Sequence, residues 1–389
     1  MPVIAPVVIV GGGIGGLSLA LSMARRGLES TVLEQAPALG AVGAGLQLGP
    51  NAIRVLAAWG LADALREQAV APARAEVRDA AAGRLLIVNR LGADAETRWG
   101  APYQVLSRAA LQSVLLAAVQ ASGRVELRLG RPVVSVRSES ERAVAVLADG
   151  SEIGGEVLFG CDGLHSVVRA AVGRPGPPRY TGQTAWRGLA EMATDGEPIV
   201  QVWTGPHRHV VRYPVDDGLV NLVAVVEAKA AEAESWTAEG QGAELAAAFA
   251  DWPEPVRATI AAAPRPWRSA LYDRGPLARW TQGRISLLGD AAHPMLPFLA
   301  QGAAMAIEDA EVAARLLGDG GDPAAALLAY EAARRPRTAK VQAWSSRNAR
   351  LFHLPSPLAA GVFGAAGVLD RVRGAAPEAR FDWLYGWTP

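Results

Sequence analysis

The sequence contains a single cysteine, Cys161, among 389 residues. One thiol cannot form an internal disulfide or supply a cysteine-based metal site, so both are excluded. The five histidines show no spacing typical of metal ligands, and we predict no metal site. Sparse cysteine is typical of proteins in a reducing compartment, which favours the cytoplasm.

Excess charge and long apolar runs are also missing. Lysine plus arginine and aspartate plus glutamate each number 38, which gives a formal net charge of zero. A neutral chain lacks the attraction that draws basic proteins to nucleic acids or anionic membranes. The apolar stretch from Pro357 to Leu369 is too short to span a bilayer, and the N-terminus lacks the basic region of a signal peptide. We therefore expect a soluble chain with neither nucleic acid nor a membrane as partner.

The glycine-rich segment after the first apolar run is the most informative feature that the chain does have. Val7 to Val10 form a strand pattern, and Gly-Gly-Gly-Ile-Gly-Gly follows over residues 11–16. Helical periodicity and a second strand pattern come next. In such a unit the glycines allow a tight turn, a close approach of the backbone to a pyrophosphate, and close packing of helix on strand. The helix N-terminus then attracts the phosphates.

Gly11, Gly13, Gly15 and Gly16 are therefore candidate dinucleotide-binding residues. Glu34 ends the second strand, where a carboxylate can accept both ribose hydroxyls and would repel a 2′-phosphate. The pattern favours FAD or NAD over NADP. A glycine-rich loop without a ligand is the alternative, which the strand, the helix and the acid around the loop disfavour.

Two later loops also follow predicted strands and carry an acid. Cys161-Asp162-Gly163 alone could be a plain turn with Ser166 as a cap, and Asp290 in Gly289-Asp290 could be a helix cap. The three loops together resemble the group A flavoprotein aromatic hydroxylases, which are FAD monooxygenases with the para-hydroxybenzoate hydroxylase fold. The resemblance runs from Val7 to the C-terminal Phe-Asp-Trp-Leu-Tyr-Gly segment.

The fold that this resemblance and the scattered strand patterns predict is α/β. It has a Rossmann-like FAD-binding domain made of discontinuous segments, an inserted mixed β-sheet substrate domain, and C-terminal helices. We expect strand patterns over 74–106 and 181–226 and helices over 51–70, 108–119, 241–262, 302–317 and 323–350. The predicted domain ranges are 1–72, 98–180 and 277–320 for FAD binding, 73–97 and 181–276 for the substrate sheet, and 321–389 for the helical region.

The resemblance also implies roles for individual residues. The loop glycines wrap the FAD pyrophosphate, and Glu34 holds the adenosine ribose. Asp162 matches the position that links binding of FAD with binding of NAD(P)H in such proteins, and Asp290 holds the ribityl chain. The further FAD contacts that it implies are Gln47, Arg108, Val134 (through its backbone), Gly302 and Ala303. The last two begin a helix whose N–H groups can stabilise negative charge on the reduced flavin.

The implied reaction uses NADH or NADPH and O2 to hydroxylate an electron-rich aromatic ring. A phenol reacts better as phenolate, which calls for a general base. His209 and Tyr213 are candidates because residues at i and i+4 of a strand face the same side. The His-x-x-x-Tyr-Pro-Val pattern, together with Gln301, resembles the 3-hydroxybenzoate 6-hydroxylase and salicylate hydroxylase branch. There the matching histidine and glutamine hydrogen-bond the phenol oxygen, and the tyrosine position is a substrate contact.

Other interpretations stay open at this point. His209 could be a structural histidine, His293 could only shape its loop, and Arg187 could bind a carboxylate or pair with a local acid. We expect 3-hydroxybenzoate hydroxylated to gentisate as the first substrate candidate. Its rivals are salicylate, 6-hydroxynicotinate and a urate-type heterocycle. A non-oxygenating flavin reductase of the same fold and a non-catalytic flavin-bound sensor are the other classes. A homodimer is compatible with the late helices.

Overall fold

The structure is a computed structural model that describes residues 7–40, 45–173, 176–194, 196–228, 242–372 and 376–389. Part of the glycine-dense loop predicted between Gly40 and Asn51 lies outside these described residues, at 41–44. Within the described ranges, none of the helices has both the length and the apolar character needed to cross a bilayer.

A six-stranded sheet forms the nucleotide-binding half of the molecule. Its strand order is β17 (Thr281–Gln282), β18 (Ile285–Leu287), β11 (Leu158–Gly160), β1 (Val7–Val10), β2 (Ser30–Leu33) and β7 (Val125–Arg128). All neighbouring pairs are parallel except β17 with β18. The apolar run of β1 is buried along its whole length, as expected for a central parallel strand with both faces covered. The long helices α1 (Ile14–Arg25), α5 (Arg108–Ala121) and α9 (Gly302–Gly318) pack together here.

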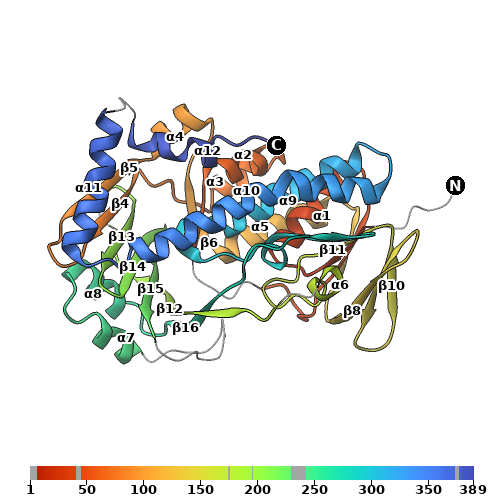
Figure 1. Ribbon diagram of the computed structural model, residues 1–389, viewed down its shortest axis with the longest axis horizontal. Coiled ribbons are helices and arrows are strands. Elements are labelled where there is room, and N and C mark those ends of the chain that lie inside the picture. The colour runs from red at the N-terminus through yellow and green to blue at the C-terminus, as the bar shows by residue number, and fades with distance from the viewer. Residues whose placement is uncertain (1–6, 41–44, 174–175, 195, 229–241, 373–375) are drawn as a thin grey trace.

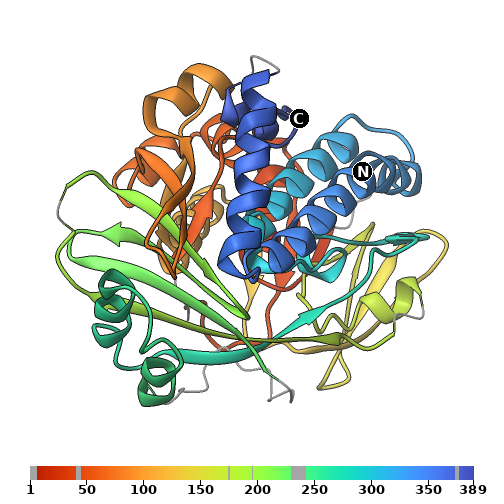
Figure 2. The same ribbon diagram turned by 60° about the vertical axis from the view of Figure 1, so that its left-hand side comes forward.

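A seven-stranded mixed sheet forms the other half. Its order is β16 (Trp267–Asp273), β12 (Arg179–Glu191), β15 (Leu219–Glu227), β14 (Arg208–Asp216), β13 (Ile199–Gly205), β4 (Arg74–Asp79) and β5 (Leu85–Arg90). Only β13 and β4 pair in parallel. Helices α7 (Gly242–Ala248) and α8 (Glu254–Ala261) cover one face through an apolar cluster that includes Trp186, Trp203 and Phe249 (Figure 2). The opposite face packs on the end of α10 (Pro323–Leu351) through Phe298 and Phe352.

Smaller elements complete the fold. Strands β3 (Gly45–Leu48) and β6 (Gln104–Ser107) pair with each other, and β8 (Val133–Ser138), β9 (Ala143–Leu147) and β10 (Glu152–Gly155) form a three-stranded sheet. Figure 1 shows this small sheet at the end of the molecule opposite α7, α8 and α11 (Ser356–Val372). The remaining helices are α2 (Pro50–Ala58), α3 (Ala62–Arg66), α4 (Gly92–Trp99), α6 (Arg169–Val172) and α12 (Asp382–Tyr385).

The α/β fold class and the inserted mixed sheet are confirmed, and the predicted strand between residues 92 and 99 is wrong. That segment is α4, which starts at a glycine with φ of 53° and ends before Gly100, whose φ of 73° is typical of a helix C-cap. The helix expected over 51–70 is interrupted at Gly60, and the one over 241–262 divides before Pro253 into α7 and α8. The helix from Arg108 is capped by the residue before it, because Ser107 Oγ accepts the Ala110 N–H at 3.0 Å.

The predicted domain boundaries and the homodimer stay predictions. Leu328, Leu358 and Val362 are exposed apolar side chains on α10 and α11.

Candidate active site

Four strands of the parallel sheet end at one edge and open into a single cavity of about 730 Å³. The loops after β1, β2, β11 and β18 carry the glycine motif, Glu34, Asp162 and Asp290, in that order. Ligands bind at the carboxyl ends of the strands in open α/β sheets. The cavity continues to the second sheet, where His209, Val211 and Tyr213 of β14 line it.

Most positions of the glycine loop are closely packed against protein atoms, whereas Gly13 is open to the cavity. Gly11 has φ of +103°, and a Cβ there would lie 2.5 Å from the Cys161 carbonyl oxygen. A Cβ on Gly16 would lie 1.9 Å from the Gly11 carbonyl oxygen, and one on Gly15 would lie 3.0 Å from Leu288. The Gly13 position meets no protein atom within 4 Å, so backbone there is open to the cavity. Helix α1 also starts at Gly13 without a side-chain cap. Its first N–H groups are thus available for phosphate oxygens.

Glu34 lies at the end of β2 and lines the cavity. Its Oε2 accepts the Gly12 N–H at 2.6 Å, and its Oε1 accepts the Ala36 N–H at 2.8 Å. Each carboxylate oxygen has a further lone pair for a ribose hydroxyl. The side chain therefore ties the glycine loop to the second strand in addition to its predicted role.

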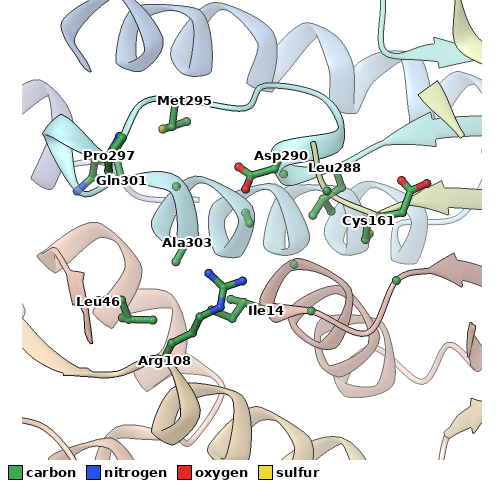
Figure 3. Close-up of a pocket in the computed structure, with 18 of the residues that line it drawn as sticks. Ile14, Leu46, Arg108, Cys161, Leu288, Asp290, Met295, Pro297, Gln301 and Ala303 are labelled. Carbon is green, nitrogen blue, oxygen red and sulfur yellow. The ribbon is translucent and has the colours of Figure 1, made fainter. Parts of the chain in front are cut away.

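Asp162 and Asp290 face the cavity from neighbouring strand ends. Asp162 Oδ2 accepts the N–H groups of Val167 and Val168, whereas its Oδ1 is buried and has no hydrogen-bond partner among the described residues. Burial raises the pKa of both carboxyl groups. The positive charge of Arg108 acts against that shift at Asp290, and Figure 3 shows the arginine rising across the cavity toward Asp290 and Ala303.

The N-terminus of α9 closes this part of the cavity. Gly302 and Ala303 line it, and the helix starts without a side-chain cap or an acid in its first turn. An adenine dinucleotide fits what is present: two uncapped helix N-termini, an open backbone at Gly13, and the unpartnered Asp162 Oδ1. Of the residues expected here, Gly16 and Val134 do not line the cavity. Gly16 packs against the Gly11 carbonyl within the loop, and Val134 lies in β8. A β-bulge in β8 turns its side chain outward, where it is 55% exposed, and Val133 lines the cavity instead.

His209 is fully buried in β14, with its ring against Phe298 and Phe352. Its Nδ1 lies 2.8 Å from His353 Nε2, and its Nε2 is buried with no hydrogen-bond partner in the described chain. Burial, and then the nearby His353, hold the pKa of His209 well below its usual range. The imidazole is therefore neutral at physiological pH and can accept a proton from a ligand.

Tyr213 lies on the same side of β14 as His209, as predicted, and both line the cavity. Burial raises the pKa of Tyr213, although hydrogen bonds with Gln47 and Asn221 oppose the shift. Gln47 also lines the cavity and accepts a hydrogen bond from the Tyr103 hydroxyl at 2.7 Å. These neutral side chains offer hydrogen bonds to a polar ring substituent.

Gln301 is held in place from behind by a buried ionic cluster. Asn51 Nδ2 donates to Gln301 Oε1 at 3.1 Å and to Glu308 Oε1 at 2.6 Å. Glu308 in turn pairs with Arg334 and Arg337, both at 2.7 Å. Gln301 Nε2 is buried and unpartnered within the described structure, and the residue lines the cavity. The amide therefore keeps a donor for a ligand.

Two further histidines have defined partners in the structure. His293 pairs with Asp309 at 2.5 Å, buried and away from the cavity wall, which agrees with the loop-shaping alternative. His353 carried no sequence signal, yet it contacts His209 from a position 144 residues away. Nothing local in the sequence marks it: α10 ends at Leu351, and the chain after it contacts the turn between β13 and β14.

A parallel sheet, a glycine loop on a helix N-terminus and three cavity-facing carboxylates define a flavoprotein of the FAD-binding α/β class. Residues 4–345 match the family described as FAD binding domain, and the chain belongs to that family. It is 38% identical to 3-amino-4-hydroxybenzoate 2-monooxygenase PtnB3 of Streptomyces platensis (98% of this chain, 96% of the relative). It is equally 38% identical to 3-hydroxybenzoate 6-hydroxylase 1 of Aquipseudomonas alcaligenes (98% and 97%).

A solved structure, Klebsiella pneumoniae HpxO complexed with FAD and uric acid, has a TM-score of 0.82 at 27% identity, covering 98% of this chain and 96% of that one. The expected family is thus confirmed. The chain is an FAD-dependent aromatic monooxygenase.

Proposed function

We propose that the protein hydroxylates a phenolic aromatic acid with NAD(P)H and O2, and that 3-hydroxybenzoate, converted to gentisate, is the first candidate substrate. The observation that carries the proposal is a pair of buried, unpartnered polar atoms on one cavity, His209 Nε2 and Gln301 Nε2. A phenol can donate its O–H to the imidazole nitrogen while its oxygen accepts the amide N–H. Both orphaned atoms are satisfied by this one functional group.

In this proposal the FAD is held by the loop glycines, Glu34, Asp162, Asp290 and the N-terminus of α9. Reduced FAD, when bound, supplies the activation of O2 for transfer to the ring. His209 removes the phenol proton at Nε2, and Gln301 donates to the resulting phenolate oxygen. The apolar side chains of Met295, Leu296 and Phe298 line the cavity and exclude water from the ring.

Arg187 of β12 is the proposed partner of the substrate carboxylate. It lines the cavity, and its Nη1 donates to Ser269 Oγ at 2.5 Å. The positive charge of Arg187 also acts on Tyr213, where it opposes the rise that burial causes in the pKa of the tyrosine hydroxyl. A guanidinium binds carboxylates in a bidentate geometry, which would orient the ring relative to His209.

A second candidate substrate is 3-amino-4-hydroxybenzoate, because relatives named for it and for 3-hydroxybenzoate are equally similar to this chain. Salicylate, 6-hydroxynicotinate and a urate-type heterocycle are the remaining candidates, and the names of more distant relatives or structural neighbours include each of them. The hydroxyl group of these acids, or an acidic ring N–H in a urate-type heterocycle, would donate to His209 in the same way.

The test is a panel of these acids scored for stimulated oxidation of NADH and of NADPH, together with product mass. The proposal expects one phenolic acid to stimulate NAD(P)H oxidation and to gain one oxygen atom from O2. Stimulated oxidation without oxygen gain in any product would instead indicate a flavin reductase. Binding of flavin without stimulation by any acid would indicate a sensor.

A further inference from the structure

A line of hydrogen-bonding groups connects His209 to the protein surface. His209 Nδ1 lies 2.8 Å from His353 Nε2, and His353 Nδ1 lies 3.0 Å from Glu227 Oε1. His209 is fully buried and the His353 side chain is 4% exposed, whereas the Glu227 side chain is 44% exposed. The three side chains thus run from the cavity wall to solvent.

The pairing of β14 with β15 and the end of α10 hold these three side chains in position. Val225 is the cross-strand partner of His209, so Glu227, two residues further along β15, faces the same side of the sheet. The chain leaves α10 at Phe352 and is held against the end of β13 and the turn before β14 by backbone hydrogen bonds, from Gly205 to Phe352 and from His207 to His353. His353 is therefore placed between the imidazole and the carboxylate by main-chain contacts.

Glu227 determines which nitrogens carry protons. An ionised carboxylate only accepts, so His353 Nδ1 carries the hydrogen and His353 Nε2 is an acceptor. His209 Nδ1 must then donate to it, which leaves a lone pair on His209 Nε2. That is the unpartnered atom on the cavity.

Other titratable and polar groups contact this line. Hydrogen bonds from His353 and His207 lower the pKa of Glu227, although burial alone would raise it. Burial lowers the pKa of His353, against the opposing effect of Glu227. His207 Nδ1 contacts the other carboxylate oxygen at 2.6 Å and is itself exposed. The Gln183 amide lies 3.4 Å from His353 Nδ1 and does not titrate.

We propose that His353 and Glu227 form a proton relay that carries the phenol proton from His209 to solvent, an inference that rests on the proposed function. The phenol O–H breaks as a bond forms to His209 Nε2. The Nδ1–H of His209 passes to His353 Nε2, and the Nδ1–H of His353 passes to Glu227 Oε1. The net change is one proton moved from the phenol to the carboxylate, which releases it to water.

The relay explains how a deeply buried histidine can act as a base. Burial disfavours a lasting imidazolium at His209. Transfer along the line leaves both imidazoles neutral at its end, so the step adds no charge to the cavity other than the negative charge of the phenolate. Reversal of the same steps returns a proton from Glu227 to the phenolate oxygen after the product forms.

Histidine 353 could instead only orient His209, and His353→Gln separates the two roles. The glutamine carbonyl can still accept the His209 Nδ1–H, but an amide does not pass a proton on. We would mix FAD-loaded enzyme with 4-hydroxy-3-nitrobenzoate, whose phenolate absorbs visible light, at a pH where the free probe is protonated. Stopped-flow absorbance then reports the rate of ionisation on the enzyme, and a titration reports probe affinity.

The relay predicts that His353→Gln and Glu227→Gln each slow ionisation by about tenfold to a hundredfold, as for a lost positioned proton acceptor, with probe and FAD affinity unchanged. Glu126→Gln on β7, whose 56% exposed carboxylate pairs with Arg128, is the matched control and should behave as wild type. If His353→Gln fails to fold, Glu227→Gln carries the test alone.

Wild-type ionisation rates in both variants would overturn the relay and assign His353 an orienting role. Wild-type enzyme that binds the probe without ionising it would also overturn the relay. An enzyme that oxygenates no phenolic acid in the substrate panel would overturn the proposed function separately, because the probe measurement needs no turnover.

Discussion

The carboxylate of Glu34 accepts the backbone N–H of Gly12 at 2.6 Å, which joins the end of β2 to the glycine loop after β1. Glu34→Ala removes both this contact and the proposed ribose ligand. We expect the FAD dissociation constant to rise by about tenfold to a hundredfold, since hydrogen bonds to charged groups contribute ~1.5–3 kcal/mol. Quenching of flavin fluorescence measures it. Glu126→Ala on the neighbouring β7, where the side chain pairs with Arg128, is the control, and equal effects of the two changes would contradict the prediction.

His209→Ala should lower hydroxylation by about 10²–10⁴-fold, the usual contribution of a positioned general base, while FAD stays bound. Product mass and FAD affinity are the two measurements. Unchanged turnover would remove His209 from the mechanism. Reduced turnover accompanied by loss of FAD would indicate a structural role instead.

Arg187→Gln should raise KM for a phenolic acid far more than it lowers kcat. Loss of one charge-assisted contact amounts to ~1.5–3 kcal/mol, or about tenfold to a hundredfold in KM. The matched uncharged phenol serves as the control substrate, since it lacks the carboxylate. Equal changes of KM for the acid and for the phenol would show that Arg187 does not bind the carboxylate.

Arg334 lies buried between Glu308 and Asp309, with both distances 2.7 Å. Arg334→Met would leave buried Glu308 with Arg337 alone and buried Asp309 with His293 alone, and we expect the free energy of unfolding to fall by ~3–5 kcal/mol. Urea denaturation measures the change. Arg335→Met on the same helix removes an ion pair with Glu331 from a 43% exposed side chain and should cost about 0–1 kcal/mol. Similar losses in the two variants would contradict the prediction.

The two buried histidines predict how stability depends on pH. Burial lowers the pKa of His209 and His353, so below a pH of about 6.5 the unfolded chain binds protons that the native state does not. Stability is therefore full above that pH and falls as the pH drops toward the native-state pKa values. Asp162 and Asp290 have raised pKa values, so at lower pH the native state binds protons that the unfolded chain does not. These two groups therefore make the free energy of unfolding increase as the pH falls.

Comparison of variants isolates the histidine contribution. His209→Phe should flatten the loss of stability between about pH 7 and pH 5, because one group that must stay neutral is gone. Urea denaturation at each pH measures the slope. An unchanged or a steeper slope in His209→Phe would contradict the assignment.

Local signals predicted the first strand–loop–helix unit well, because turn geometry and periodicity lie within residues 7–34. Ser107 was also predictable as a helix cap for the same reason. The α4 helix was missed because its short apolar pattern reads equally as a strand. The outward direction of the Val134 side chain could not be predicted, because a bulge in β8 is not visible in the pattern.

Long-range partners were beyond sequence reasoning. His353 and Glu227 reach His209 only through the pairing of β14 with β15 and the exit of α10, and nothing local to either residue marks them. Gln301 entered as a candidate through family resemblance alone. Its support by Asn51 joins residues 250 positions apart.

The parallel pairing of β4 with β13 brings residues 74–79 beside residues 199–204. The substrate-facing sheet is thus assembled from two stretches of chain separated by the α5 segment and the small three-stranded sheet. A chimaera that exchanged only residues 181–276 with a homologue would combine foreign strands β12 to β16 with its own β4 and β5 in one sheet. Recombination aimed at altering substrate preference should therefore transplant β4 and β5 in the same step.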